Sequence, residues 1–275
     1  MGWPRLRLVV LNKKKILITG FPHTGTSILK SKLGEAKNVY EVIDENFEAR
    51  HSDIINSNGK EFILVKSPII PLEIRVRGVK YLTLKDPVSI YKDYCVIFVT
   101  RNPWNLFTSI IKVGDDPLSH ESWHLSPKYA LTVEEYFVSL ERFIEAQNGN
   151  FPNIYTIKYE EFFEDNFSKI KNIMDDIGLN YEYDIFETQK KVYKFKSNIE
   201  YNGFDKPDES DRNAIRTWQI NQPFQNMNKE VNIPDELDKL LKESELVKKL
   251  GYTDPRITNW YPIGYIIPYK SILYN

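Results

Sequence analysis

Four short runs of almost uninterrupted apolar residues set the first expectation about the fold. They are KILITG (15–20), EFILVK (61–66), CVIFVT (95–100) and IYTIKY (154–159), and VYEVI (39–43) is a weaker fifth. None of the four alternates polar and apolar positions, and this is the pattern of strands buried on both faces, as in parallel sheets. We therefore expect these runs to form one buried, mostly parallel sheet.

Patterns with helical spacing fill the intervals between these runs. They cover 26–33, 103–112 beginning at Pro103, a helix through 133–144 capped by Thr132, 160–178 ending at Gly178, and a last helix from Pro234 and Asp235 to KKLGY (248–252). Alternation of strands and helices is typical of a parallel sheet covered by helices. We expect a single three-layer α/β domain over 1–275, with its core at about 15–252 and an irregular, aromatic-rich tail over 253–275.

Composition and charge exclude several classes of protein. The 275 residues carry a net charge of −1, so no bulk field attracts nucleic acid or an anionic membrane, and any anion site must be built locally. The single cysteine, Cys95, excludes a disulfide framework, and its apolar run predicts a core position. No stretch reaches the roughly 20 apolar residues of a membrane span. We expect a cytoplasmic protein that binds neither nucleic acid nor membrane.

The first candidate site is the stretch GFPHTGTS (20–27), which follows the first predicted strand. Its spacing is that of a phosphate-binding loop, except that Thr26 stands where such a loop has lysine. Glycines let successive main-chain amides point inward, and the following helix adds a partial positive charge. Thr24, Thr26 and Ser27 add hydroxyl groups. The alternative is a plain turn between a strand and a helix.

The second candidate site consists of cations at strand ends. One run ends in Lys66, another leads into Arg101, and Ser109 follows eight residues after this arginine. An arginine at this edge of an α/β sheet faces the ligand crevice and suits phosphate. An ATP or GTP hydrolase would instead need the loop lysine and a magnesium-binding carboxylate. The pattern predicts phosphate binding without metal. The alternative is that Arg101 pairs with a surface carboxylate and that Ser109 is a neutral helix residue.

These two motifs resemble those of sulfotransferases that use 3′-phosphoadenosine 5′-phosphosulfate (PAPS). The PxxGT[ST] loop of that family is matched by Pro22, Gly25, Thr26 and Ser27, and its RNPxxxxxS segment by Arg101, Asn102, Pro103 and Ser109. The resemblance implies a P-loop-NTPase-like sulfotransferase fold. It also implies that residues 22–27, with His23 and Thr24, hold the 5′ group, and that Arg101 and Ser109 hold the 3′-phosphate.

Weaker similarities extend the resemblance to about residues 15–252. LVKSP (64–68) implies that Lys66 contacts the leaving group, and IKYEEF (157–162) implies that Tyr159 lies near adenine. IRTWQ (215–219) and KKLGY (248–252) are similar to common late features of the family.

The chain also departs from the family pattern. His23 occupies a loop position that often carries lysine or arginine, and imidazole is only partly charged near neutral pH. The family's Lys-Thr-His segment reads Lys66-Ser67-Pro68, so its histidine base is absent. The late Arg-Lys-Gly segment is absent too, and Arg212 or Arg216 is the candidate replacement.

The resemblance implies transfer of a sulfuryl group from PAPS to a hydroxyl or amine, with PAP as product and no metal. Loop amides, Lys66 and, when its ring is protonated, His23 would then stabilise the leaving oxygen. Among the charged residues of EVIDENFEARH (41–51), which include Asp44 and Glu48, we favour Glu45 as the base and place His51 second. A solvated surface is the alternative.

The acceptor remains open between a small molecule, a glycan and a peptide. His120, Trp123 and His124 lie in a long polar segment and are candidates for its pocket, with ordinary loop residues as the alternative. Two other functions stay open. One is a nucleotide kinase with a degenerate loop, which would need Mg²⁺ and ATP; the other is a catalytically silent nucleotide-binding protein. The sequence does not indicate an oligomeric state.

Overall fold

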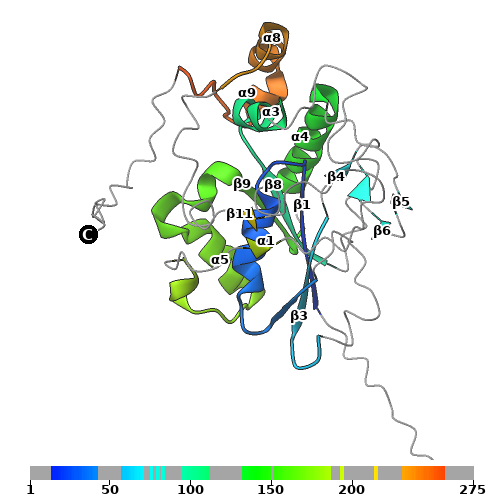
Figure 1. The fold of residues 1–275 in the computed structure, drawn as a ribbon, viewed down its shortest axis with the longest axis vertical. Helices are drawn as coiled ribbons and strands as arrows, with labels where there is room; N and C mark the ends of the chain where they lie inside the picture. Colours follow the sequence, from blue (N-terminus) through cyan, green and yellow to red (C-terminus); the bar gives the residue numbers. More distant parts are fainter. Residues whose placement is uncertain are drawn as a thin grey trace, which may run out of the picture.

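The computed structural model describes most of the predicted core. The described ranges are 14–42, 57–67, 94–111, 132–149, 151–186 and 231–257, together with the backbone of six two-residue strands at 69–70, 75–76, 79–80, 82–83, 193–194 and 214–215. Within these ranges, helices flank a central sheet (Figure 1).

The central sheet has five strands, all paired in parallel. They are β1 (Lys14–Gly20), β2 (Val39–Glu41), β3 (Phe62–Lys66), β8 (Tyr94–Thr100) and β9 (Ile154–Lys158), in the order β2-β3-β1-β8-β9. The expectation of a buried parallel sheet is confirmed, including the weak fifth strand. Because all strands run the same way, their carboxyl ends meet at one edge, where α/β sheets bind ligands.

Three further strand pairs are short. They are β4 (Ile69–Ile70) with β7 (Leu82–Thr83), β5 (Arg75–Val76) with β6 (Val79–Lys80), and β10 (Tyr193–Lys194) with β11 (Ala214–Ile215).

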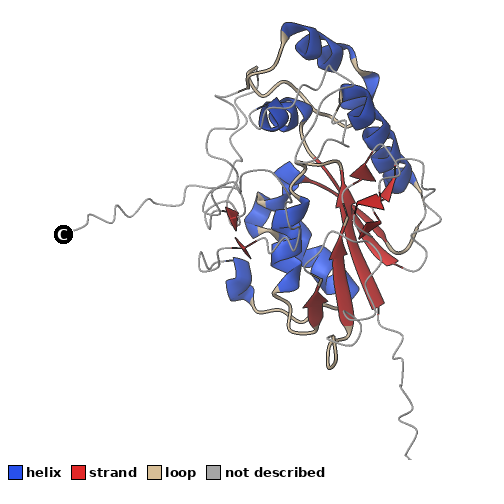
Figure 2. Cartoon of the chain, turned by 45° about the vertical axis from the view of Figure 1, so that its right-hand side comes forward, coloured by secondary structure: helices blue, strands red, loops and turns tan. Residues whose placement is uncertain are grey.

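The helices lie on both faces of the sheet. They are α1 (Thr26–Gly34), α3 (Pro103–Ile111), α4 (Val133–Asn148), α5 (Ser168–Ile177), α8 (Asp235–Glu243) and α9 (Glu245–Lys249). Short 3-10 turns occur at η2 (Tyr159–Phe162), η3 (Glu164–Asn166) and η4 (Tyr183–Phe186). Figure 2 shows helices on either side of the red sheet and a further group beyond its upper end.

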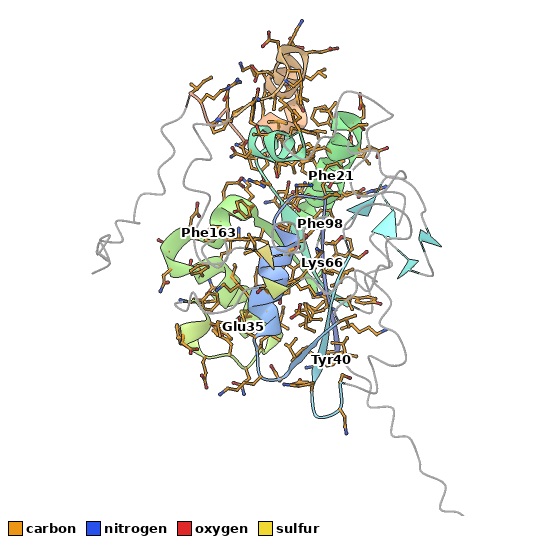
Figure 3. All side chains as sticks on the ribbon, in the orientation of Figure 1. Phe21, Glu35, Tyr40, Lys66, Phe98 and Phe163 are labelled. Atoms are coloured by element: carbon orange, nitrogen blue, oxygen red, sulfur yellow. The ribbon has the colours of Figure 1, made fainter. Side chains whose placement is uncertain are left out.

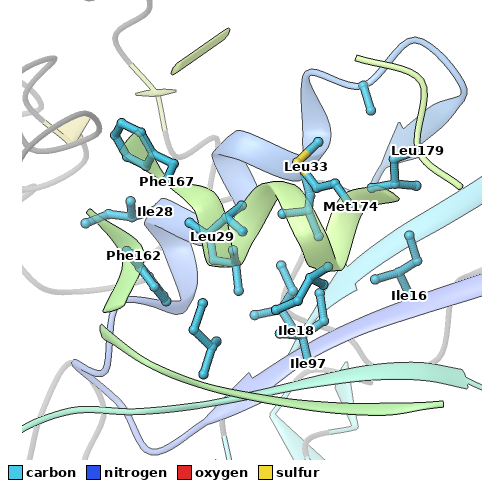
Figure 4. Packing of buried hydrophobic residues seen from close by; sticks show 14 of the residues in the cluster. Ile16, Ile18, Ile28, Leu29, Leu33, Ile97, Phe162, Phe167, Met174 and Leu179 are labelled. Atoms are coloured by element: carbon cyan, nitrogen blue, oxygen red, sulfur yellow. The ribbon is translucent and has the colours of Figure 1, made fainter. Parts of the chain in front are cut away.

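Two hydrophobic clusters attach these helices to opposite faces. On one face, side chains of β1 and β8 such as Ile18 and Ile97 meet Leu29 of α1 and Met174 of α5 (Figure 4). On the other face, Phe98 of β8 packs edge-on against Phe143 of α4, with ring centroids 5.7 Å apart. Neighbouring strand residues point to opposite faces, so a fully apolar run serves both clusters. The three-layer α/β architecture is therefore confirmed.

The expected helix over 160–178 is wrong in its first half. Two 3-10 turns occupy this part, and Asp165, Asn166 and Phe167 have φ of 43°, 55° and 62°, which no α-helix contains. The apolar spacing across the break remains helical, and the one local signal for the break is the pair Asp165 and Asn166, since Asp and Asn adopt positive φ more readily than most residues. The Glu161 carboxylate accepts from the Lys158 amide at 2.7 Å and stabilises the first turn. The stop at Gly178 is confirmed, with φ 88°.

The expected last helix is two helices. Ser244 has extended backbone between α8 and α9, and its Oγ accepts from the Val247 amide at 3.4 Å as an N-cap. The N-cap expected at Thr132 is confirmed, since its side chain accepts from the Glu135 amide at 3.3 Å.

Cys95 is only partly buried, against the hydrophobic cluster that contains side chains of α1 and α5. Burial raises the pKa of its thiol to about 12.

Across the part of the chain that the structure describes, no helix has both the length and the apolar character needed to cross a membrane. Most of the predicted tail, from 258 onward, lies outside the described residues.

Candidate phosphate-binding site

The loop between β1 and α1 is built around two glycines that no other residue could replace without displacement. Gly20 has φ 155°, and a Cβ there would lie 2.3 Å from the main-chain oxygen of Val99. Gly25 has φ 94°, and its Cβ would lie 2.4 Å from Cδ2 of Tyr159. Both contacts are far shorter than real Cβ contacts. The sequence spacing of these glycines therefore reflects a close approach of the loop to β8 and Tyr159.

The residues between the glycines close the loop. The Thr24 hydroxyl donates to the main-chain oxygen of Phe21 at 2.7 Å, and the Thr24 amide contacts the same oxygen at 3.3 Å. His23 has φ 67°, a left-handed conformation that is costly for a residue with a Cβ. Thr24 is fully buried, so its hydroxyl supports the loop. A direct contact of Thr24 with a ligand stays a prediction.

The loop leads directly into the first turn of α1. Gly25 is the N-cap, and no side chain caps this end of the helix. The first amides of a helix have no partner inside it, and together with the helix dipole they favour an anion. The first turn contains no acidic residue that would oppose this. The loop that contains Pro22 and His23 therefore ends where an anion is favoured, beside the main-chain amides of Thr26 and Ser27.

Lys66, the last residue of β3, reaches this helix end. Its ammonium donates to the Ser27 hydroxyl at 2.7 Å, and its side chain is only 4% exposed. β3 lies beside β1, so the register of the sheet brings Lys66 level with Ile18, two residues before the loop. In Figure 3, Phe21 and Lys66 lie above Glu35 and Tyr40, toward the carboxyl edge of the sheet. The fold thus brings Lys66 to the start of α1, while its contact with a leaving group stays a prediction.

Arg101, the first residue after β8, approaches the loop from the other side. Its Nη1 donates to the main-chain oxygen of His23 at 3.0 Å. Its guanidinium carbon lies 4.7 Å from the centroid of the Tyr159 ring. The side chain is 6% exposed and points to the glycine turn. The two sequence motifs therefore meet at one edge of the sheet.

The main chain at Arg101 is fixed by residues from distant segments. The Tyr136 hydroxyl donates to the Arg101 oxygen at 2.6 Å. The Asn102 amide donates to Glu160 Oε1 at 2.8 Å, and the Asn102 side chain donates to the Thr253 oxygen at 2.9 Å. Burial raises the pKa of Glu160, while the Asn102 amide and the charge of Arg101 act in the opposite direction. Three residues from different segments, Tyr136, Glu160 and Thr253, thus hold the turn at Arg101 and Asn102.

His23 and Ser109 link the two motifs a second time. His23 Nδ1 and Ser109 Oγ are 3.0 Å apart and form a hydrogen bond whose direction depends on the tautomer of the ring. Ser109 lies on α3, which begins at Pro103 as predicted. The loop position that departs from the family pattern is therefore adjacent to the serine of the second motif.

Tyr159 lies directly behind both motifs. Its ring is 1% exposed, and it contacts Gly25 and the Arg101 guanidinium. The resemblance places this residue near adenine, whereas in this structure its ring is covered by protein. The adenine contact stays a prediction.

The remaining predicted site residues lie outside the described part of the chain. These are the base candidates Glu45 and His51 with Asp44 and Glu48, the arginines Arg212 and Arg216, and the acceptor-pocket candidates His120, Trp123 and His124. Their roles stay predictions.

Sequence reasoning missed the residues that hold the Arg101 turn. Glu160 follows Tyr159 directly, and its place in the IKYEEF segment is the one available signal. Tyr136 and Thr253 sit in a helix and a loop with no motif of their own.

Comparisons with known proteins support the fold. No family model matches the sequence, and no curated protein matches it. Among solved structures, mouse sulfotransferase SULT7A1 complexed with PAP is similar with a TM-score of 0.50 and 15% identity, covering 88% of this chain and 87% of that one. The sulfotransferase domain from the curacin biosynthetic pathway is similar with a TM-score of 0.51 and 11% identity, covering 88% of this chain and 98% of that one. The chain has the fold of these sulfotransferases.

Proposed function

We propose that the chain is a PAPS-dependent sulfotransferase, which moves a sulfuryl group to a hydroxyl or amine of an acceptor. One observation carries the proposal: the glycine loop and Arg101 meet, through the 3.0 Å hydrogen bond from the guanidinium to the His23 oxygen. Two anion sites side by side suit a nucleotide with phosphates at both ends. The fold that the chain shares with the mouse enzyme complexed with PAP supports this assignment.

The donor set of the site fits such a nucleotide. Gly20 and Gly25 let the loop pass close to Val99 and Tyr159, and the loop ends at the start of α1, which no side chain caps. Lys66 adds an ammonium group on one side, and Arg101 adds a guanidinium on the other. Guanidinium binds phosphate through paired N–H donors and keeps its charge at all relevant pH values. We assign the 5′ phosphosulfate to the loop and Lys66, and the 3′-phosphate to Arg101 and Ser109.

The same residues provide the chemistry of transfer. The sulfur–oxygen bond to the 5′-phosphate breaks, a bond from sulfur to the acceptor oxygen or nitrogen forms, and the acceptor proton passes to a base. Lys66 holds positive charge at the loop, where the leaving phosphate oxygen gains negative charge. His23, in the same loop, donates a proton or a hydrogen bond to that oxygen when its ring is protonated. We keep Glu45 as the proposed base and His51 as its alternative.

We also propose that transfer proceeds without a metal ion. The carboxyl ends of β3 and β8 carry Lys66 and Arg101, two cations, at positions where a magnesium site would need carboxylates. The kinase alternative requires Mg²⁺ bound with the nucleotide. A cytoplasmic location and the identity of the acceptor stay predictions.

Calorimetry with PAP in the presence of EDTA tests the proposal. The proposal predicts micromolar or tighter binding of PAP without metal and weaker binding of ADP. Absence of PAP binding would reject it, and binding of ATP only with Mg²⁺ would favour the kinase. PAP binding without transfer from labelled PAPS to any phenol, sugar or peptide acceptor would favour the catalytically silent protein.

A further inference from the structure

Tyr159 lies between the two anion sites and contacts both. A Cβ on Gly25 would lie 2.4 Å from Cδ2 of its ring, so the ring packs directly against the loop glycine. The Arg101 guanidinium lies over the same ring, 4.7 Å from its centroid. With 1% of the residue exposed, the protein covers the ring almost completely. The aromatic side chain therefore supports the guanidinium and leaves little surface for a base to stack on.

Neighbouring aromatic residues hold this ring in place. Phe162 and Phe163 lie 5.4 Å and 5.6 Å from Tyr159, centroid to centroid, and Phe163 meets it edge-on at 77°. Both are at most 2% exposed. A ring packed in this way has little freedom to turn, since protein interiors are close-packed. Burial also raises the pKa of Tyr159 to about 12, so the ring stays neutral near pH 7.

The residue after Tyr159 fixes the other half of Arg101. The Glu160 carboxylate accepts from the Asn102 amide at 2.8 Å and so holds the main chain that carries the arginine. Tyr159 holds the guanidinium itself. Two consecutive residues of η2 thus hold the Arg101 guanidinium and the main-chain amide that follows Arg101. A side chain that the protein already holds in place does not lose its rotamer entropy when the phosphate binds, and the cation–π contact with Tyr159 stabilises that held position.

We propose that Tyr159 is a positioning residue that acts through Arg101 and sets the affinity for the 3′-phosphate of the nucleotide. The proposal rests on the function proposed above. It differs from the adenine contact that the family resemblance implies, because a residue that contacts adenine contributes equally to nucleotides with and without a 3′-phosphate. A residue that acts through Arg101 contributes only when the 3′-phosphate is present.

The test compares PAP with adenosine 5′-monophosphate (AMP), which lacks the 3′-phosphate. The ratio of the two affinities is measured by calorimetry for the wild-type protein, Tyr159→Leu, Tyr159→Phe and Arg101→Gln. We expect Tyr159→Leu to lower the PAP/AMP ratio about tenfold, which corresponds to about 1.4 kcal/mol. Tyr159→Phe keeps the aromatic ring and should have the same PAP/AMP ratio as the wild-type protein. Arg101→Gln removes the guanidinium itself, so its loss of the PAP/AMP ratio is the largest that a Tyr159 variant can cause.

Two further variants separate positioning from general damage. Phe163→Leu removes a ring that packs against Tyr159 but keeps Tyr159 itself under the guanidinium, so it should lower the ratio clearly less than Tyr159→Leu even if the protein is less stable. Tyr159→Met also removes the ring but introduces a flexible, unbranched side chain that adapts to an irregular gap, and it should repeat the result of Tyr159→Leu if that variant folds poorly. Adding Tyr159→Leu to Arg101→Gln should change the ratio no further, because Tyr159 acts through the arginine.

The outcomes distinguish this inference from the proposed function. If Tyr159→Leu and Tyr159→Met weaken PAP and AMP equally, or change neither, the inference is overturned while the proposed function stands. A loss of ratio in Phe163→Leu as large as that in Tyr159→Leu also overturns it. Failure of the wild-type protein to bind PAP would instead overturn the proposed function itself.

Discussion

The loop after β1 and the turn after β8 lie beside each other but are built in different ways. The loop presents its own backbone, and its shape depends on Gly20 and Gly25, where a Cβ would meet the Val99 oxygen or the Tyr159 ring. The turn presents one long side chain, Arg101, whose main chain is held by Tyr136 and other partners from distant segments. One site is made by local conformation, the other by tertiary packing.

This difference predicts how each site fails. A backbone cradle should be lost in one step when a glycine is replaced, since the added Cβ forces its neighbours to shift and strains a backbone of positive φ. A guanidinium held by several partners should lose affinity in steps as each partner is removed. The following variants test this contrast, and they are ordered by their largest expected effect on either nucleotide affinity or turnover.

Gly25→Ala should have the largest effect on nucleotide binding. The substitution adds a Cβ 2.4 Å from Tyr159 at a φ of 94°, and strain with overpacking of this kind costs roughly 2–5 kcal/mol. We expect PAP affinity to fall by about 100-fold or more in calorimetry. Gly59→Ala is the matched control, because Gly59 has φ 79° but nothing within 4 Å of the added atom. If both variants bind PAP like the wild-type protein, the loop is not the cradle.

Lys66→Ala should affect turnover more than binding. The ammonium lies 2.7 Å from the Ser27 hydroxyl at the start of α1, where the proposed leaving oxygen gains charge. Removing one such donor typically costs roughly 10²–10³-fold in turnover. We expect this loss in a labelled-PAPS assay, with PAP affinity reduced less than tenfold. A turnover equal to that of the wild-type protein would remove Lys66 from the mechanism.

Ser109→Ala should weaken nucleotide binding by less than Gly25→Ala does. It removes a hydroxyl that lies 3.0 Å from His23 Nδ1 and is proposed to contact the 3′-phosphate. A hydrogen bond to a charged group contributes about 1.5–3 kcal/mol, so PAP affinity should fall by roughly 10- to 100-fold and AMP affinity should stay constant. Equal losses for both nucleotides would place the serine away from the 3′-phosphate.

Lys32→Met should change stability but not nucleotide binding. Lys32 lies near the far end of α1 from the loop, and burial lowers its pKa from 10.5 to about 8, against the opposing charge of Glu35. Between these two pH values the folded protein binds fewer protons than the unfolded chain, so its stability rises with pH. The rise attributable to Lys32 is on the order of 3 kcal/mol.

Denaturant unfolding at pH 8 and at pH 10.5 measures this rise. The wild-type protein should gain stability relative to Lys32→Met across the window, and both proteins should bind PAP equally at pH 7.5. Parallel pH profiles for the two proteins would show that burial of the ammonium has no such cost. A loss of PAP affinity in Lys32→Met would show that the loop depends on the far end of its helix.

The contrast between the two sites also explains what could be predicted from the sequence. The five strands and the glycine loop were predictable, because uninterrupted apolar runs and two spaced glycines are local signals. Arg101 was predictable as a residue at a strand end. Its supports were not, since Tyr136, Glu160 and Thr253 are separated from their partners at Arg101 or Asn102 by 35, 58 and 151 residues.

Two predicted helix boundaries were wrong for the same reason, because they depend on contacts between distant segments. The left-handed residues around Phe167 carry no glycine or proline, so the break before α5 depends on tertiary contacts. Ser244 begins a new helix within a continuous helical pattern, and its capping role shows only in the folded chain.

A crystal structure of the protein with PAP is the sharpest test of the two adjacent anion sites. We expect the 5′-phosphate at the main-chain amides of residues 24–27 beside Lys66, and the 3′-phosphate within hydrogen-bonding distance of Arg101 and Ser109. No metal ion should lie between the phosphates and the protein. A nucleotide bound elsewhere, or bound here with its 3′-phosphate directed away from Arg101, would contradict the account.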